Sequence, residues 1–182
     1  MHPLHLFRFC PVCGSQHFVE NNFKSKKCEQ CGFVYYFNSA AATAIFITNK
    51  TGELLVVRRA KEPAKGSLDL PGGFVDMSET AEEAIIRELK EETGLLISKP
   101  EYLFSLPNIY RYSGFDVHTV DMFFQSSVDA FTGLQAADDA EALFFLEKDK
   151  IKPELFGLNS IRQAVEVWSR GGNNYSILKF LY

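Results

Sequence analysis

The sequence predicts an α/β domain whose sheet is covered by helices on both faces, preceded by a small module that contains all the cysteines. Strand-like runs occur before, between and after two amphipathic helical segments, and two Cys-x-x-Cys pairs lie near the N-terminus. A length of 182 residues is enough for one well-cored domain with a small module attached. We therefore expect the module at residues 1–36 and the larger domain at residues 37–182.

The composition is that of a globular protein without a general affinity for polyanions. The chain is 46% apolar and 23% charged, and its formal net charge is −4. Nonspecific binding to nucleic acid or anionic membranes depends on clustered Lys and Arg, so neither is expected as a partner. No apolar run reaches the length of a membrane span, and the start "MHPLHLFRFCPVCG" lacks the long apolar core of a secretory signal. We therefore expect a cytoplasmic location.

The cysteines are predicted to bind one structural zinc ion. The pairs are "CPVC", with Cys10 and Cys13, and "CEQC", with Cys28 and Cys31, and fourteen residues separate them. This spacing is typical of a tetrahedral site of four thiolates, and the glycine that follows each pair suits a tight turn. Two disulfides or a redox pair are the alternatives, disfavoured by a reducing compartment and by the lack of a strand-to-helix context. A module of this size can hardly bury a core, so zinc would supply most of its folding energy.

The larger domain begins with two apolar runs, "AAATAIFIT" and "GELLVVRRA", and the turn signal "NKTG" between them predicts a hairpin. A Gly- and Pro-rich loop follows, in which "LDLPGG" is a short candidate strand. The later candidate strands are "ISKPEYLFSLPN", "FDVHTVDMFFQSS" and "EALFFLE". The segment "NSIRQAVEVWSRGG" predicts a helix with Asn159 or Ser160 as its N-cap and Gly171 just past its end.

The first helix is predicted between Glu79 and Thr93. Within it, Ala81, Ile85 and Leu89 recur every four residues and form a stripe that we expect to pack on the sheet.

The same helix carries Glu88, Glu91 and Glu92, whose carboxylates share one face because they lie at positions i, i+3 and i+4. An ordinary solvated acidic face is the alternative. However, two carboxylates about 6 Å apart repel by roughly 3 kcal/mol at an effective dielectric constant near 20, and a helical ion pair returns only about 0.2 to 0.5 kcal/mol. A cation is therefore expected beside them, and hard oxygen ligands suit Mg²⁺ or Mn²⁺.

The loop before this helix has features of an anion site. Gly72 and Gly73 of "LPGG" expose backbone amides at the N-terminal end of a helix, whose dipole favours negative charge, and we expect phosphate as the anion. Arg58 and Arg59 end the preceding strand. Because their side chains alternate in direction, we expect one to face the phosphate and the other to be a surface charge.

Residues 73–95 resemble the Nudix box at every fixed position. The order is glycine, five free positions, Glu79, seven free positions, Arg87-Glu88, an aliphatic residue, one free position, Glu91-Glu92, one free position, glycine and an aliphatic residue. This resemblance implies an α/β/α sandwich with a mixed sheet that hydrolyses a nucleoside diphosphate linked to another group, with a divalent metal. It also implies that Glu88, Glu91 and Glu92 ligate Mg²⁺ or Mn²⁺ and that Arg87 holds the loop through Glu79.

A zinc ribbon that runs through "YYFN" into a Nudix domain is similar to the NADH pyrophosphatase branch of the family. That branch carries Ser-Gln-Pro-Trp after the box, and this chain has "SLPNIY" there. Ser105 and Pro107 match, but Leu106 and Asn108 replace the glutamine and the tryptophan. We therefore expect a dinucleotide or an ADP-ribose-like nucleotide as substrate, in preference to NADH.

Several further residues are candidates for the site. Tyr110 and Tyr112 would stack on a base, although alternating aromatic residues also pack within strands. The family resemblance points to a general base in "ADDAEALFF", either Asp138 or Glu141, with Glu88 as the other choice. A solvated acidic turn is the plain alternative for this loop. A homodimer is left open.

A catalytically silent Nudix domain that senses a nucleotide, with a ribbon that binds nucleic acid or protein, is the rival hypothesis. Lys24, Lys26 and Lys27, with Phe23, form a small basic patch on the ribbon, which also reads as solubilising charge. A sensor has less need of three converging acidic ligands, so the sequence favours an enzyme, a Nudix hydrolase.

Overall fold

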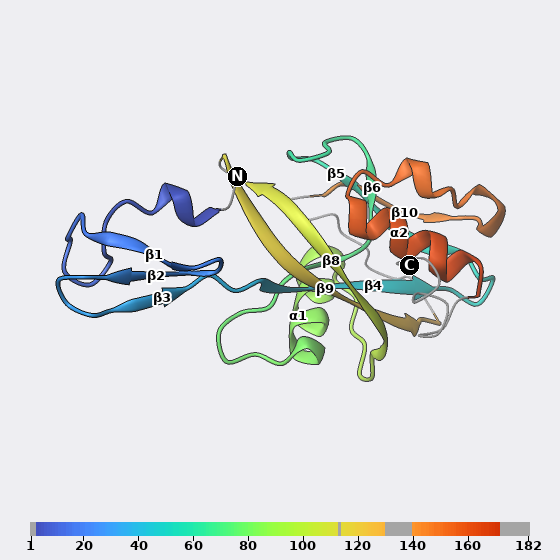
Figure 1. Ribbon diagram of the computed structural model, residues 1–182. Coiled ribbons are helices and arrows are strands. Elements are labelled where there is room, and N and C mark those ends of the chain that lie inside the picture. Colours follow the sequence, from blue (N-terminus) through green and yellow to red (C-terminus); the bar gives the residue numbers. More distant parts are fainter. Residues whose placement is uncertain (1–2, 113, 130–139, 172–182) are drawn as a thin grey trace. The chain divides into compact units, whose positions relative to one another are not determined.

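The structure is a computed structural model and describes residues 3–112, 114–129 and 140–171 (Figure 1). The chain divides into two compact units. The first comprises the described residues up to Ser39 together with Ile109–His118, and the second comprises Ala40–Asn108 and the described residues from Thr119 onward. The domain boundary predicted at residue 36 stays a prediction.

The first unit is built on a small antiparallel sheet with the order β1-β2-β3. Its buried residues are Cys10, Phe18 and Cys28, against which three half-buried aromatic residues pack. So small a core can hardly stabilise a fold alone, which is why a cross-link between the cysteine pairs matters here. The elements are the 3-10 helix η1 (Pro3–Leu6), β1 (Phe18–Asn22), β2 (Ser25–Cys28) and β3 (Val34–Tyr36).

The segment Ile109–His118 joins this unit through aromatic contacts. The rings of Phe7 and Phe115 stack with centroids 5.9 Å apart and planes 8° apart. Phe37 meets Phe115 and His118 edge-on, with centroid distances of 5.9 Å and 6.1 Å. Offset stacked and edge-on rings are favourable arrangements, so these contacts extend the small apolar core of the ribbon.

The second unit contains a mixed sheet with the order β10-β5-β4-β9-β8, in which β6 pairs with β5 and β7 pairs with β4. Strands β4 and β9 are parallel, whereas β5 is antiparallel to both β4 and β10. The predicted hairpin of the first two runs is present. The strands are β4 (Ala40–Thr48), β5 (Leu54–Arg59), β6 (Leu68–Asp69), β7 (Gly72–Phe74), β8 (Glu101–Tyr112), β9 (Phe115–Ser127) and β10 (Ala140–Leu146).

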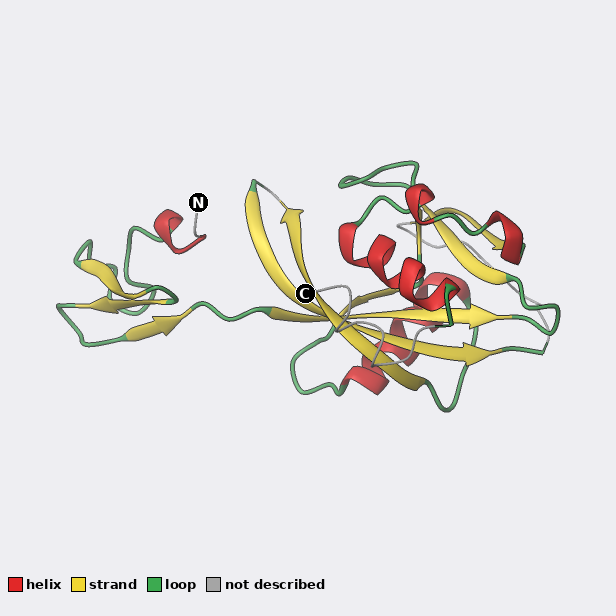
Figure 2. Cartoon of the chain, turned by 45° about the vertical axis from the view of Figure 1, so that its right-hand side comes forward, coloured by secondary structure: helices red, strands yellow, loops and turns green. Residues whose placement is uncertain are grey.

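Helices cover both faces of this sheet, α1 (Ala81–Thr93) on one and α2 (Asn159–Ser169) on the other (Figure 2). Alternate residues of β4 show this, because Ile45 and Ile47 belong to the core cluster beneath α1, and Phe46 belongs to the cluster beneath α2. The indole of Trp168 stacks on Phe46 with centroids 4.8 Å apart. The predicted α/β/α class with a mixed sheet is therefore confirmed.

Helix α1 has a complete capping box. The Thr80 hydroxyl accepts from the Glu83 amide at 3.2 Å, and the Glu83 carboxylate accepts from the Thr80 amide at 2.8 Å. The helix ends at Gly94, whose φ of 76° closes the last turn. The predicted stripe faces the sheet, since Ile85 and Leu89 are fully buried. The box sequence therefore forms its helix with local signals at both ends.

Helix α2 begins one residue earlier than predicted. Its N-cap is Leu158, rather than Asn159 or Ser160, and no side chain caps the first turn. The Ser160 hydroxyl instead donates to the buried carboxylate of Asp121 at 2.5 Å, so a tertiary contact has taken the group that the sequence suggested as a cap. Two short 3-10 helices, η2 (Lys148–Lys150) and η3 (Pro153–Leu155), precede it. Among the described helices, none has the length and apolar character to cross a membrane.

Candidate active site and metal centre

Arg87 of α1 forms a two-pronged ion pair with Glu79 in the loop before the helix. Its Nε donates to Glu79 Oε1 and its Nη2 to Glu79 Oε2, both at 2.8 Å, and Nη2 also donates to the Phe74 carbonyl at 3.0 Å. Paired bonds of this kind fix geometry as well as charge. The contact that the family resemblance implied, Arg87 holding the loop through Glu79, is thus present in the structure.

The same guanidinium faces three more carboxylates. Nη1 lies 2.8 Å from Glu88 and 3.4 Å from Glu91, and Nη2 lies 3.8 Å from Asp76. The hydrogen bonds that Arg87 donates to Glu79 and Glu88 raise the pKa of Arg87 above its usual value, so it stays protonated. Four carboxylates around one guanidinium leave an excess of negative charge. The site therefore attracts a cation.

The pKa values of Glu79 and Glu88 are shifted in opposite directions. The bonds from Arg87, with help from the Asp76 amide, lower the pKa of Glu79 to about 2. Burial raises the pKa of Glu88, against the opposing effect of Arg87, and the charge of Glu91 adds to the rise. Glu79 is thus a permanent anion, whereas Glu88 takes a proton more readily than an ordinary glutamate.

Close approach to backbone requires glycine at position 72, and Gly73 lies against the end of the Glu88 side chain. A Cβ on Gly72, whose φ is 150°, would lie 2.1 Å from the Thr43 carbonyl oxygen, and a Cβ on Gly73 would lie 2.5 Å from the Glu88 carboxylate. The Gly72 amide donates to Glu92 Oε2 at 2.9 Å. The strand before the helix thus contacts two of the predicted metal ligands directly. The predicted binding of phosphate by Gly72 and Gly73 stays a prediction.

The carboxylates of Glu88, Glu91 and Glu92 have the donor chemistry for Mg²⁺ or Mn²⁺, which prefer hard oxygen ligands. In the structure, Glu88 is bonded to Arg87 and Glu92 to the Gly72 amide, so each has a donor of its own. Their ligand atoms do not gather as closely as those of the cysteines, the one such group in the part of the chain that is described. The donor chemistry of these three glutamates fits such a metal ion, and their assignment as its ligands stays a prediction.

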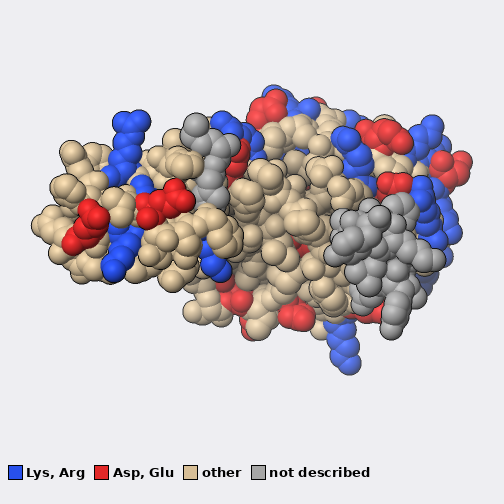
Figure 3. All heavy atoms as spheres, in the orientation of Figure 1, with Lys and Arg blue, Asp and Glu red and all other residues tan. Residues whose placement is uncertain are grey.

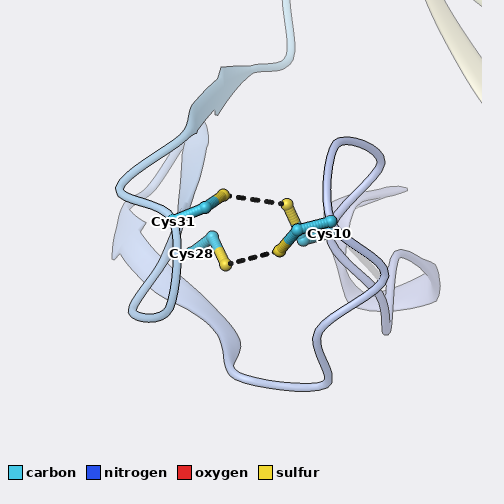
Figure 4. Close-up of side chains that lie close together, drawn as sticks. Cys10, Cys28 and Cys31 are labelled. Atoms are coloured by element: carbon cyan, nitrogen blue, oxygen red, sulfur yellow. Dashed lines mark hydrogen bonds between the residues drawn. The ribbon is translucent and has the colours of Figure 1, made fainter.

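The four cysteines lie together in the first unit, with all their sulfur atoms within 4.8 Å of one another (Figure 4). Cys10 and Cys31 have sulfurs 3.7 Å apart, and Cys13 and Cys28 have sulfurs 3.6 Å apart. A tetrahedral zinc ion with Zn–S bonds of about 2.3 Å would place its ligands about 3.8 Å apart. The spacing therefore fits zinc, and it is far too long for disulfides.

The turns around the cysteines favour ionised sulfur. The backbone amides of Cys31 and Gln30 donate to the Cys28 sulfur and lower the pKa of its thiol to about 6, although burial acts in the opposite direction. The Ser15 amide acts in the same direction on Cys13, but burial and the other three sulfurs raise the pKa of Cys13 to about 12. Four sulfurs this close ionise together only when a cation offsets their charges.

Arg58 and Arg59 point apart, as the strand alternation predicted. The Arg58 guanidinium donates to the Gly66 carbonyl at 2.9 Å and lies over the Phe144 ring. Arg59 is largely buried and pairs with Asp69 at 2.5 Å. Asp69 was not predicted as a partner of Arg59, although an acid flanked by Leu68 and Leu70 is a signal that points to a buried polar contact.

A second unforeseen group surrounds Asp121, a buried acid of β9. Its carboxylate accepts from Thr119, Ser160 and Asn108 at distances of 2.5, 2.5 and 3.0 Å. Three donors allow a buried carboxylate to remain inside the fold. Asn108, which replaces the tryptophan of the NADH pyrophosphatase motif, is thus part of an internal network, and its neighbour Leu106 belongs to the core.

The remaining candidates belong to other elements of the chain. Tyr110 and Tyr112 belong to the first unit, where their rings lie 6.3 Å apart and 25° from parallel. Glu141 is an exposed residue of β10. Asp138 lies outside the described residues. The roles of these four residues stay predictions.

A match to the NUDIX domain family spans residues 38–164, which include the whole acidic helix and its lead-in loop. The chain belongs to the Nudix family. This membership confirms the predicted assignment as a Nudix hydrolase. Over 128 residues, the Nudix chain is 35% identical to the ADP-ribose pyrophosphatase of Methanocaldococcus jannaschii, covering 69% of this chain and 72% of that protein.

Two further comparisons bear on the Nudix assignment. The NAD-capped RNA hydrolase NudC of Deinococcus radiodurans is 33% identical over 109 residues, which are 58% of this chain but only 39% of that protein's length. The crystal structure of a NUDIX hydrolase from Nitrosomonas europaea superposes with a TM-score of 0.72 at 18% identity, covering 91% of this chain and 94% of that one. This structural likeness shows the fold alone.

The cysteine geometry predicts about one zinc ion per chain in protein purified without chelator. Cys28→Ser should lose the ion and expose the amides of residues 3–39 to hydrogen exchange, while those of β4 and β5 keep their protection. Glu29→Gln, a change at an exposed neighbour of Cys28, should retain zinc. Elemental analysis that finds no zinc in the parent, or full zinc in Cys28→Ser, would contradict the assignment.

The pair of Glu79 with Arg87 predicts a specific dependence of stability on pH. Because the folded pKa of Glu79 is about 2, below its ordinary value of 4.5, the pair contributes its full stability above pH 4.5 and loses it as the pH falls toward 2. Denaturant unfolding across that range should therefore give a smaller loss of stability for Glu79→Gln than for the parent. Glu82→Gln, at an exposed acid of the same helix, should keep the parent's profile. Equal losses in parent and Glu79→Gln would refute the prediction.

Proposed function

We propose that this Nudix chain hydrolyses the diphosphate bond of a nucleoside diphosphate linked to a second group, with ADP-ribose-like compounds as the leading substrate class. The observation that carries the proposal is the group of Glu88, Glu91 and Glu92 on one helix, fixed from one side by Arg87 and from the other by the Gly72 amide. The identity with an ADP-ribose pyrophosphatase over most of both chains supports the substrate class.

The chemistry divides between a metal ion and the protein. Mg²⁺ or Mn²⁺, held by Glu88, Glu91 and Glu92, would supply the positive charge that neutralises a diphosphate and makes water more acidic. The oxygen of water adds to one phosphorus atom, the bridging P–O bond breaks, and the other phosphate leaves with its group. For ADP-ribose the products are a nucleoside monophosphate and a sugar phosphate.

The protein supplies position and a proton acceptor. Arg87 fixes the helix against the loop through Glu79, so the carboxylates stay aligned with the strand that carries Gly72. Glu88 is one candidate to take the proton from water, because burial raises its pKa toward the range useful for a base. Asp138 and Glu141 remain the other candidates.

The substrate preference should differ from that of NADH pyrophosphatases. Leu106 is 2% exposed and packs in the core. Asn108 is bonded to Asp121 inside the fold, at a position where the related branch has a tryptophan. Neither residue offers the amide or the aromatic ring of that branch to a ligand, so NADH should be a poorer substrate than ADP-ribose.

The rival of a silent nucleotide sensor that also binds nucleic acid gains little support. On the face shown in Figure 3, basic and acidic side chains are interspersed, without the single basic patch that polyanion binding uses. All three acidic side chains predicted to bind the metal are present. A small nucleotide is therefore the proposed partner.

The proposal predicts Mg²⁺-dependent release of monophosphates from ADP-ribose or dinucleoside polyphosphates, faster than from NADH, in a panel that also includes nucleotide sugars and nucleoside triphosphates. Glu92→Gln should lower turnover by at least about 100-fold, since changes at residues that only support metal ligands already cost about 10- to 100-fold. Its stability should be unchanged or slightly higher in the absence of metal, because a like charge is removed.

Glu82→Gln is the matched control, because it removes an exposed carboxylate from the same helix and should leave turnover unchanged. Absence of metal-dependent hydrolysis across the panel would favour the silent sensor. Near-normal activity of Glu92→Gln would show that the metal site is elsewhere, and efficient cleavage of NADH in preference to ADP-ribose would overturn the substrate class.

A further inference from the structure

Arg59 and Asp69 form a largely buried ion pair at the ends of β5 and β6. Arg59 Nη1 donates to Asp69 Oδ2 at 2.5 Å, and the two side chains are 17% and 10% exposed. Arg59 Nε donates to the Pro63 carbonyl at 2.7 Å. Two nitrogens of the guanidinium are thus bonded within the protein, which fixes the direction of the Arg59 side chain.

A short, hydrogen-bonded segment leads from Asp69 to the acidic helix. Asp69 Oδ1 accepts from the Leu70 amide at 2.9 Å, and the Pro71 carbonyl accepts from a backbone amide of β4 at 3.0 Å. The next residue, Gly72, donates its amide to Glu92 Oε2 at 2.9 Å. One end of the segment is thus fixed by the ion pair, and the other end fixes Glu92.

This segment has little freedom to adjust. Three residues span at most about 10 Å when fully extended, so the ion pair and the Gly72 amide lie close to each other. Gly72 lies against the backbone of Thr43 so closely that even a Cβ would overlap its carbonyl oxygen. We therefore expect a displacement of Asp69 to disturb the position of the Gly72 amide.

Each partner of the ion pair depends on the other. Removing one member of a buried pair leaves an uncompensated charge, and the surrounding chain then moves or the remaining group becomes neutral. Burial already raises the pKa of Asp69 against the opposing charge of Arg59. Loss of Arg59 would thus change the carboxyl group that accepts the Leu70 amide.

We propose that Arg59 and Asp69 are positioning residues for the Glu92 carboxylate, acting through the Gly72 amide, and that Arg59 does not contact the substrate phosphate. This inference rests on the proposed function, in which Glu92 ligates a divalent metal ion. One of Arg58 and Arg59 was expected to face a phosphate. The inference gives Arg59 a different role.

The test compares Asp69→Asn, Arg59→Gln and the double variant. Each single variant should raise the Mn²⁺ dissociation constant, measured by electron paramagnetic resonance without substrate, by about 10- to 100-fold. The Mg²⁺ concentration at half-maximal turnover should rise in parallel, while KM for ADP-ribose at saturating Mg²⁺ stays within about twofold. Because the two residues act as one unit, the double variant should be no worse than either single variant. Lys65→Gln, a change at an exposed residue of the adjacent loop, should match the parent.

Asp69→Glu, which retains the charge, should keep most of the parent's Mn²⁺ affinity. This variant can also be measured if Asp69→Asn fails to fold. A raised KM in Arg59→Gln with unchanged Mn²⁺ affinity would overturn the proposal, because it would make Arg59 a phosphate ligand. Unchanged Mn²⁺ affinity in both single variants would also overturn the proposal. Mg²⁺-dependent hydrolysis by the parent tests the proposed function separately, so the two failures are distinguishable.

Discussion

The candidate site depends on the guanidinium of Arg87, which forms a bidentate ion pair with Glu79 and also faces Glu88 and Glu91. Without it, the repulsion among the carboxylates on one face of α1 would be uncompensated, and the loop before the helix would lose its ion pair with the helix. Arginine suits this place because its planar fork bonds two carboxylates at once and it keeps its charge at any physiological pH. The guanidinium therefore joins the acidic helix to the loop that precedes it.

The sheet gives this unit a rigid base. Ile85 and Leu89 are fully buried against it, which fixes the rotation of α1 and hence the direction of its acidic face. Strand β7 contacts the same face: the Gly72 amide bonds Glu92, and the absence of a side chain at Gly73 leaves room for Glu88. Packing, backbone and ion pairs thus act on the same few carboxylates, which is the kind of support that a metal site needs.

Local sequence signals predicted much of this arrangement. The run "AAATAIFIT" is strand β4, the apolar periodicity predicted the stripe of α1, and the family resemblance implied the contact of Arg87 with Glu79. The contacts that escaped prediction join residues far apart in the chain, such as Ser160 with Asp121, which displaced the expected helix cap. Spacing along one element carries no information about such partners, and the same is true of the pair of Arg59 with Asp69. The amide of Gly72 was expected to bind an anion, and the anion that the structure places there is the side chain of Glu92.

The central claim is that the carboxylates of α1 bind the catalytic divalent ion. A crystal structure with Mn²⁺ and AMP, with data collected at the manganese absorption edge, tests it most directly. The account predicts an anomalous peak within about 2.3 Å of carboxylate oxygens from at least two of Glu88, Glu91 and Glu92, with the two bonds from Arg87 to Glu79 intact. A peak bound by other residues, or none at saturating Mn²⁺, would contradict it.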